Sequence, residues 1–257
     1  MTSILKSAAS GIIAQKYNMD VIANNIANLQ TTGFKKTRLL FADGPYENHT
    51  VPVPEGSNPE PDFKAGTGVR VAGVQRIFSP GSLQETGNAW DLAIAGEGFF
   101  QVGLPDGRKA YTRDGAFQID GKGQLATAEG YLVDPPVTIP PGAENVSIDE
   151  GGTVRASVNG ENVELGSIRI ATFPNPEGLY AVGHNLFTAS EASGEAQVDQ
   201  PGTGTRGKIV SGVLEDANVD LGEEMTRAIE AQRAYELCIK VFQTADEMLG
   251  MANNLSR

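Results

Sequence analysis

The sequence predicts an α+β fold in which both ends of the chain are helical and the middle is a mainly antiparallel β domain. Apolar residues recur every seven residues near each end, whereas the middle has short apolar runs separated by Asp-Gly and Asn-Gly turns. The 31 glycines and 14 prolines among 257 residues argue against an all-helical bundle. We therefore expect a discontinuous helical domain, residues 1–34 and 214–257, and a central β domain, residues 66–213.

The N-terminal pattern consists of two rows of residues, each with a spacing of seven. The first row is Leu5, Ile12, Met19 and Ile26, and the second is Ala8, Gln15, Ile22 and Leu29. Such rows are typical of a coiled coil, although a helix lying on a globular core gives the same periodicity. Asn24, Asn25 and Asn28 cluster late in this predicted helix, either as local caps or as hydrogen-bonding partners of neighbouring helices. Gly33 is a natural stop for the helix.

The C-terminal pattern also has two rows, one of large and one of small side chains. They are Leu221, Ala228, Tyr235, Phe242 and Leu249, and Ala231, Cys238, Ala245 and Ala252. Small side chains allow a partner helix to come close, so a packing role is favoured for Cys238 over a reactive thiol. Because the middle offers no third helix, we expect about residues 3–31 and 217–255 to pack together as a coiled coil.

The middle of the chain consists of short predicted strands. The runs FFQVGL and RKAYTR flank Asp106-Gly107, which predicts a hairpin, and Asn159-Gly160 separates the runs TVRASV and ENVELG. Residues 68–77 and 167–173 are further strands, and this spacing predicts an antiparallel sandwich or a barrel-like domain. Prolines between residues 43 and 65 exclude a regular helix and a central strand, so we expect residues 35–65 to be an extended linker or insert.

No catalytic, cofactor or metal site is predicted. Gly202, Gly204 and Gly207 match G-x-G-x-x-G, but the segment KIVSGVLE that follows is typical of a strand, so a turn is favoured over a nucleotide site. Five acidic residues stand mostly beside glycine, where carboxylates stabilise turns: Asp91, Glu97, Asp106, Asp114 and Asp120. His49 and His184 have no partner at ligand spacing.

The net charge and the distribution of apolar residues restrict the partners and the location of the chain. A net charge of −12 argues against binding to nucleic acid or through a basic membrane-binding face. No run reaches the ~18 apolar residues of a membrane span. The N-terminus lacks a convincing signal peptide, so we expect a chain that is either cytoplasmic or exported without a cleaved signal.

Four segments resemble the signatures of one protein family, the bacterial flagellar rod and hook proteins. They are ANNIANLQTTGFK (23–35) at the N-terminal end, DLAIAGEGFFQV (91–102) and YTRDGAFQID (111–120) in the middle, and residues 217–249, with NVD, EM, QRAYE and T-x-D-x-ML, at the C-terminal end. Cys238-Ile239 departs from the small polar residues that are frequent there, and Ala217 stands where serine is common. The resemblance covers nearly the whole chain.

The resemblance implies a structural subunit of the flagellar basal body that stacks helically into the drive shaft, with the terminal helices as an inner tube. It implies as partners further copies, proximal rod proteins, the hook protein, the surrounding P-ring and L-ring, and the type III export apparatus, with a location across the periplasm. Length, YTRDG, QRAYE and the insert after Phe41 are most similar to members of the distal rod, with the proximal rod as the alternative. Outside the family, a secreted β-sheet binding module explains only the middle of the chain, and an enzyme lacks a catalytic constellation.

The helical ends and the insert are therefore the expected subunit contacts. In the helical ends we expect them at Leu5, Ile12, Met19, Ile22, Asn24, Asn25, Ile26, Asn28, Leu29, Gly33, Phe34, Leu221, Met225, Gln232, Tyr235, Ile239, Phe242 and Leu249. In the insert we expect them at Tyr46, Pro52, Pro54, Pro59 and Phe63.

Overall fold

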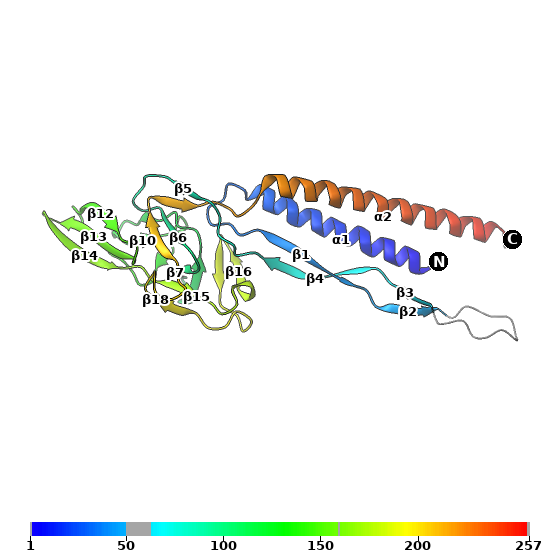
Figure 1. Cartoon of the computed structure of the whole chain (residues 1–257), viewed down its shortest axis with the longest axis horizontal. Coiled ribbons are helices and arrows are strands. Elements are labelled where there is room, and N and C mark those ends of the chain that lie inside the picture. Colours follow the sequence, from blue (N-terminus) through cyan, green and yellow to red (C-terminus); the bar gives the residue numbers. More distant parts are fainter. Residues whose placement is uncertain (1, 50–62, 159, 256–257) are drawn as a thin grey trace. The chain divides into compact units, whose positions relative to one another are not determined.

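The computed structural model describes residues 2–49, 63–158 and 160–255 and confirms an α+β fold with a helix at each end (Figure 1). The chain forms two compact units. The helical unit comprises residues 1–27, 37–76 and 220–257, and the β unit comprises residues 28–36 and 77–219. Each unit therefore contains segments that are distant in the sequence.

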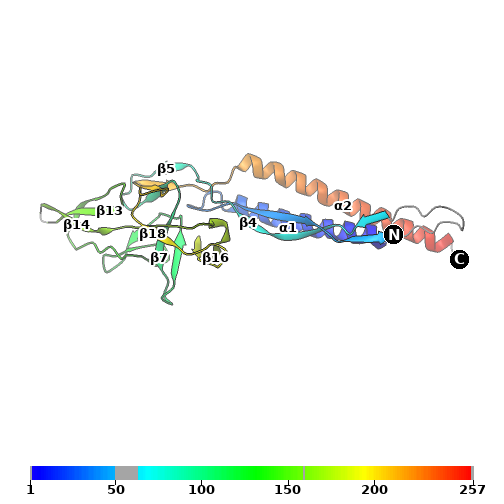
Figure 2. The same ribbon diagram turned by 60° about the horizontal axis from the view of Figure 1, so that its bottom comes forward.

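Two long helices dominate the helical unit, α1 (Thr2–Ala27) and α2 (Leu221–Leu255). They pack side by side, as Figures 1 and 2 show. A Cβ atom on Gly11 would lie 2.9 Å from the Sγ atom of Cys238, so the two helices approach closely at this point. The ends of the chain therefore pair as the small-residue row predicts, whereas a regular coiled-coil geometry stays a prediction. Within the described residues, neither helix has an apolar stretch that is long enough to cross a membrane.

Both helices are shorter than the heptad pattern predicts at the ends that face the middle of the chain. α2 begins at Leu221 because Asp220 caps it: the Oδ1 atom of Asp220 accepts a hydrogen bond of 3.0 Å from the backbone N–H of Glu223. α1 ends at Ala27, and the chain then turns, since the carbonyl of Asn28 accepts the N–H of Thr31 at 3.1 Å.

Among its described residues, the helical unit also contains four strands. They are β1 (Thr37–Asp43), β2 (Tyr46–His49), β3 (Phe63–Gly66) and β4 (Val69–Arg76). β1 pairs antiparallel with β4, and β2 pairs antiparallel with β3. Leu39 of β1 is buried, and both β1 and β4 contact α1.

This arrangement differs from the expected domain boundaries. Residues 37–43, 46–49 and 63–66 are paired strands where an extended linker is expected. β4 belongs to the helical unit, whereas the β domain is expected to begin at residue 66. A two-stranded ribbon is marginal in water, so β1 and β4 gain stability by packing on α1. Residues 28–34 and 214–219 belong to the β unit, where the terminal helical domain is expected.

The β unit is built from short antiparallel strands. Its largest sheet has the order β16 (Tyr180–Gly183), β17 (Leu186–Thr188), β8 (Lys109–Thr112), β7 (Phe99–Gly103), β11 (Leu132–Val133), β10 (Leu125–Ala126) and β9 (Gln118–Ile119), with β15 (Ile170–Thr172) between β7 and β18 (Gln197–Asp199). A second sheet contains β12 (Glu144–Ile148), β13 (Thr153–Val158) and β14 (Glu161–Ser167). Two further pairs are β6 (Leu92–Ala95) with β19 (Lys208–Ser211) and β5 (Leu83–Glu85) with β20 (Val213–Glu215). A 3-10 turn covers Pro176–Gly178. The predicted hairpin at Asp106-Gly107 is confirmed as the pair β7 with β8, and β13 pairs antiparallel with β14.

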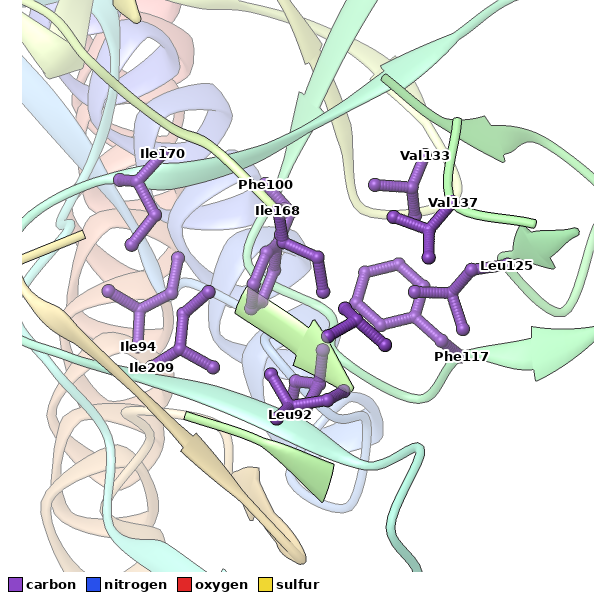
Figure 3. Packing of buried hydrophobic residues seen from close by; sticks show 12 residues of the cluster. Leu92, Ile94, Phe100, Phe117, Leu125, Val133, Val137, Ile168, Ile170 and Ile209 are labelled. Atoms are coloured by element: carbon purple, nitrogen blue, oxygen red, sulfur yellow. The ribbon is translucent and has the colours of Figure 1, made fainter. Parts of the chain in front are cut away.

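The core of the β unit consists of aliphatic side chains around an aromatic pair (Figure 3). Phe100 and Phe117 meet edge to face with their ring centroids 5.1 Å apart. Leu92, Ile94 and Ile209 lie beside them and are at most 1% exposed. Each fully buried side chain of this size contributes roughly 1.5–3 kcal/mol, so the β unit has a hydrophobic core of its own.

Candidate assembly surface

The helical unit exposes many large apolar side chains. On α1 and the sheet they are Ile4, Ile13, Tyr17, Leu40, Phe41, Val71 and Val74, and on α2 they are Leu221, Met225, Ile229, Leu237, Val241, Phe242, Met248 and Met251. Large contiguous apolar patches are rare on soluble monomers, and where exposed apolar side chains gather they mark interaction sites. The surface itself is therefore the candidate functional site.

α2 has apolar side chains on two opposite faces. Ala231 and Ala245 are buried, and they repeat with the spacing that packs against α1. At 100° per residue, Ile229 lies about 160° around the helix from both alanines, and Leu237 lies about 80–120° from them; they are 51% and 61% exposed. A helix that is apolar on both sides needs cover on both sides, and one chain covers only one of them.

A groove lies between α1 and the β1–β4 ribbon, with a volume of about 330 Å³. Its lining consists of Tyr17, Asp20, Val21 and Asn24 from α1, Thr37 and Leu39 from β1, and Val71 and Val74 from β4. Five of these eight side chains are aliphatic or aromatic, and Asp20 is the charged residue among them. The helical unit thus has a recessed apolar surface in addition to the outer face of α2.

Asn25 of α1 forms hydrogen bonds to β1 and to α2 within the helical unit. Its Oδ1 atom accepts the backbone N–H and the hydroxyl of Thr37 at 2.9 and 3.2 Å. Its Nδ2 atom donates to the carbonyl of Thr37 at 2.9 Å and to Oε2 of Glu224 at 3.0 Å. Both N–H groups of the amide are used, and the residue is 1% exposed. Of the two interpretations of the asparagines, hydrogen bonding to neighbouring elements therefore holds for Asn25, within one chain.

Replacing Asn25 with aspartate is expected to destabilise the helical unit by about 1–3 kcal/mol at neutral pH. The new carboxylate lies beside Glu224 and leaves the carbonyl of Thr37 without its donor. Two adjacent carboxylates raise each other's pKa in the folded state above the unfolded values near 4. The folded state then binds more protons, so the loss of stability decreases as the pH falls through this range.

Urea unfolding of the full chain, followed by circular dichroism at 222 nm at neutral and acidic pH, measures this effect. The control is Asn24→Asp, which adds the same charge one residue earlier at an exposed position. An equal loss for both variants, or a loss for Asn25→Asp that does not change with pH, would contradict the role of Asn25.

The segment after α1 docks into the β unit through Gly33 and its neighbours. Gly33 has φ of +65°, and its N–H donates to the carbonyl of Glu215 at 2.7 Å. A Cβ atom there would lie 2.5 Å from the backbone nitrogen of Asp114. The hydroxyl of Thr32 donates to Oδ1 of Asp114 at 2.8 Å, and Phe34 is buried. The predicted helix stop at Gly33 is therefore also a close contact between two backbone segments.

A buried ion network follows directly after this contact. The Nζ atom of Lys35 donates to Oε1 of Glu215 at 2.6 Å and to the carbonyl of Ser79 at 2.8 Å. The guanidinium of Arg113 donates to Oε2 of Glu215 at 3.3 Å and to the carbonyls of Ile94 and Gly96. Burial lowers the pKa of Lys35, while Glu215 opposes this shift, and burial also lowers the pKa of Arg113.

Asn218 ties the same region together from the other side. Its Oδ1 atom accepts the backbone N–H of Lys36 at 2.7 Å, and its Nδ2 atom donates to the carbonyl of Ile77 at 2.8 Å and to the carbonyl of Ser79 at 3.1 Å. Three segments of the β unit, around residues 36, 78 and 218, are thereby fastened to one another. This gives the NVD sequence a structural role that its pattern alone does not reveal.

The carboxylates considered for chemistry stabilise turns or polar contacts. Oδ1 of Asp120 accepts the backbone N–H groups of Lys122 and Gln124, and Asp106 accepts the N–H of Arg108. The predicted glycine turn closes with a hydrogen bond from Gly202 to Gly207, and strand β19 follows it instead of a helix. In the described part of the chain, no group of His, Cys, Asp and Glu side chains is arranged to hold a metal ion.

The predicted interface residues divide by their exposure. The exposed ones are Asn24, Leu221, Met225, Gln232 and Phe242, and the half-buried ones are Leu5, Ile12, Met19, Ile26, Asn28, Leu29, Tyr235, Ile239 and Leu249. Four are buried within the single chain, where they pack or form hydrogen bonds internally: Ile22, Asn25, Gly33 and Phe34. The exposed and half-buried residues are those that still offer surface to another subunit.

The predicted insert contacts fall mostly outside the described residues. Pro52, Pro54 and Pro59 lie outside the described residues, as does the side chain of Phe63. Tyr46, in strand β2, is 62% exposed. Sequence reasoning missed the outer face of α2, because the heptad rows select positions seven residues apart. The spacing of four between Ile229, Arg233 and Leu237 is the signal that shows this face.

Comparison with known protein families gives three matches along the chain. The model of the flagella basal body rod protein matches residues 5–35, that of the flagellar hook protein FlgE/F/G D1 domain matches residues 93–156, and that of the flagellar basal body rod FlgEFG protein C-terminal region matches residues 210–255. These matches cover the start, the middle and the end of the chain.

Similar proteins from distant bacteria match over the full length. The flagellar basal-body rod protein FlgG of Borreliella burgdorferi is 44% identical over 264 residues, which cover 100% of both chains. Its namesake in Caulobacter vibrioides is 40% identical and covers 98% of both chains, and that in Bacillus subtilis is 39% identical over 99% of this chain and 100% of the relative.

Proposed function

We propose how this chain acts in the flagellum, from the premise that it belongs to the family of flagellar basal-body rod proteins. It is a structural subunit of the rod, and its place is the flagellar basal body. The proposal is that copies of the chain stack helically into the distal rod, which transmits torque from the motor to the hook. The distal position is supported by the full-length similarity to several FlgG proteins.

The observation that carries this proposal is the apolar surface of the helical unit. Met225, Ile229 and Leu237 are each more than half exposed on α2, although α2 already packs against α1. A subunit that covers this surface with another copy gains hydrophobic stabilisation with each contact. A head-to-tail contact whose rotation does not close produces an open helical filament, which is the shape of a shaft.

The partners and the insert belong to the same proposal. Proximal rod proteins and the hook protein would bind the two ends of the shaft, and the P-ring and L-ring would surround it across the periplasm. The type III export apparatus would deliver the subunits. We further propose that residues 43–65 contact neighbouring copies and stiffen the shaft, because the proline-rich part restricts the backbone. Tyr46, which lies within this segment and is exposed, supports the idea.

A strain that lacks the gene, complemented in turn by two forms of the chain, tests the function. We expect basal bodies from the uncomplemented strain to lack a complete rod and hook in electron micrographs. The intact chain should restore both, and complete rods in the uncomplemented strain would refute the proposal.

The second form tests the insert without disturbing the strands beside it. His49 and Phe63 are directly paired between β2 and β3, so an Asn-Gly turn can replace residues 50–62 and close the same hairpin. We expect this variant to be exported at the normal level but to build shorter or more flexible rods. Rods of normal length and stiffness would show that the proline-rich part makes no contribution.

A further inference from the structure

We propose that the groove between α1 and the β1–β4 ribbon of one copy receives the α2 ridge of a second copy. The ridge is formed by Ile229, Arg233 and Leu237, and Arg233 then faces Asp20 of the groove. This inference rests on the proposed stacking of copies, and it specifies which two surfaces meet.

The groove has the size and the lining of a binding site for aliphatic side chains. Its volume is about 330 Å³, and an apolar cavity of about 150 Å³ is already large enough to hold benzene. Val71 and Val74 form one wall, and Tyr17 and Val21 form the other. Val74 is 59% exposed and Tyr17 is 51% exposed, so both leave apolar surface in water that an occupant would cover.

The ridge matches the groove in length and in character. Residues 229, 233 and 237 are spaced by four, so they form one ridge of the helix surface that rises by about 12 Å. The wall of the groove on α1, from Tyr17 to Asn24, rises by about 10 Å at the same rise per residue. An apolar ridge that fills an apolar groove is a common mode of helix recognition.

The charges of the two surfaces are complementary. Asp20 is the charged residue of the groove, and Arg233 stands between the two aliphatic residues of the ridge. Both are exposed, and within the described residues neither has an ion-pair partner. Pairing them across the contact would fix the register of the ridge in the groove, because charge complementarity acts mainly on specificity.

The groove and the ridge are different surfaces of one chain, and this determines the kind of assembly. A contact between them is head-to-tail, so each copy still offers a free groove or a free ridge to the next copy. A ridge that packed against a second ridge would instead close a symmetric dimer and stop growth. The proposed contact therefore fits a filament, whereas the symmetric alternative does not.

A charge exchange in the full chain tests the contact in a strain that lacks the gene. We expect Asp20→Arg and Arg233→Asp each to reduce the number of complete rods roughly tenfold, because like charges then face each other. The double variant Asp20→Arg with Arg233→Asp should restore most of the rods. The control is Asp20→Arg with Lys240→Asp, which has the same net charge but places the aspartate elsewhere on α2, and it should not restore them.

Cross-linking supplies a second measurement that does not depend on the strength of one ion pair. With Cys238 replaced by alanine, Val74→Cys is combined with Ile229→Cys or with Leu237→Cys, and assembled rods are treated with a short bismaleimide. We expect a ladder of covalent oligomers from at least one double variant and none from the single-cysteine variants.

The outcomes separate this inference from the proposed function. Dimers from a single-cysteine variant, or rods that form while neither double variant cross-links, would overturn the groove-and-ridge contact. Equal restoration by both charge-exchange doubles would overturn the role of Asp20 and Arg233. All of these results leave the rod function standing, which fails only if complete rods form without the chain.

Discussion

Replacing Gly33 with alanine is expected to lower the free energy of unfolding of the β unit by about 4 kcal/mol. Two causes act together. The φ angle of +65° disfavours any residue with a Cβ atom, and the new methyl group would lie 2.5 Å from the backbone nitrogen of Asp114 and 2.6 Å from the carbonyl carbon of Arg113. Backbone atoms cannot swing aside as the end of a flexible side chain can, so the segment would have to leave its site.

Gly107→Ala is the matched control for this variant. Gly107 also lies in the β unit and has φ of +80°, but a Cβ atom there meets nothing within 4 Å. It should therefore show only the conformational cost, about 1 kcal/mol. Urea unfolding followed by the fluorescence of Trp90, the single tryptophan, reports on the core of the β unit against which Trp90 packs. Equal losses for the two variants would mean that the close approach at Gly33 does not contribute to the loss of stability.

The helices and hairpins could be predicted because their signals are local. Heptad rows near each end and turn residues such as Asp106-Gly107 specify an element within a short stretch of sequence. The pairing of β1 with β4, and their place in the helical unit, could not be predicted in this way. Their pairing joins residues 37 and 76 across a proline-rich segment, and strand sequences carry no label for their partner.

The candidate surface was predictable only in part, for a different reason. A heptad row indicates that one face of a helix is buried, but it does not show whether that face packs against its own chain or against another copy. Ile22 and Met225 both stand in the expected interface set, yet Ile22 is 4% exposed within the chain and Met225 is 54% exposed. Only the positions of α1, α2 and the sheet in space separate the internal contacts from the surface that is left over.

The buried ion network is the part of the structure furthest from sequence reasoning. Lys35, Arg113 and Glu215 are distributed over the whole chain, and each looks like an ordinary surface charge in its own segment. Burying two cations with one carboxylate is costly unless every group has partners. The carbonyls of Ser79, Ile94 and Gly96 supply part of them, so the network depends on the finished fold.

Replacing Glu215 with glutamine is expected to destabilise the β unit by about 3–5 kcal/mol at neutral pH. The substitution keeps the shape of the side chain but leaves Lys35 and Arg113 buried without a negative partner. Urea unfolding followed by Trp90 fluorescence measures the loss. A loss below about 1 kcal/mol would mean that the carboxylate does not compensate the two cations.

The pH dependence of this loss tests whether the charge on Lys35 causes most of the destabilisation. Burial already lowers its pKa below the ordinary 10.5, and Glu215 is the group that raises it again, so the variant lowers the pKa further. The unfolded chain then binds more protons than the folded one between the lowered pKa and 10.5, and stability rises with pH across this window. We therefore expect the loss to be largest near neutral pH and to shrink as the pH rises, until the pH exceeds the folded-state pKa of Lys35 in both the variant and the unaltered chain, which lies below 10.5. In the double variant Glu215→Gln with Lys35→Met the amine is gone, so the remaining loss should not shrink over this range, and a loss that shrinks equally in both variants would assign the effect to another group.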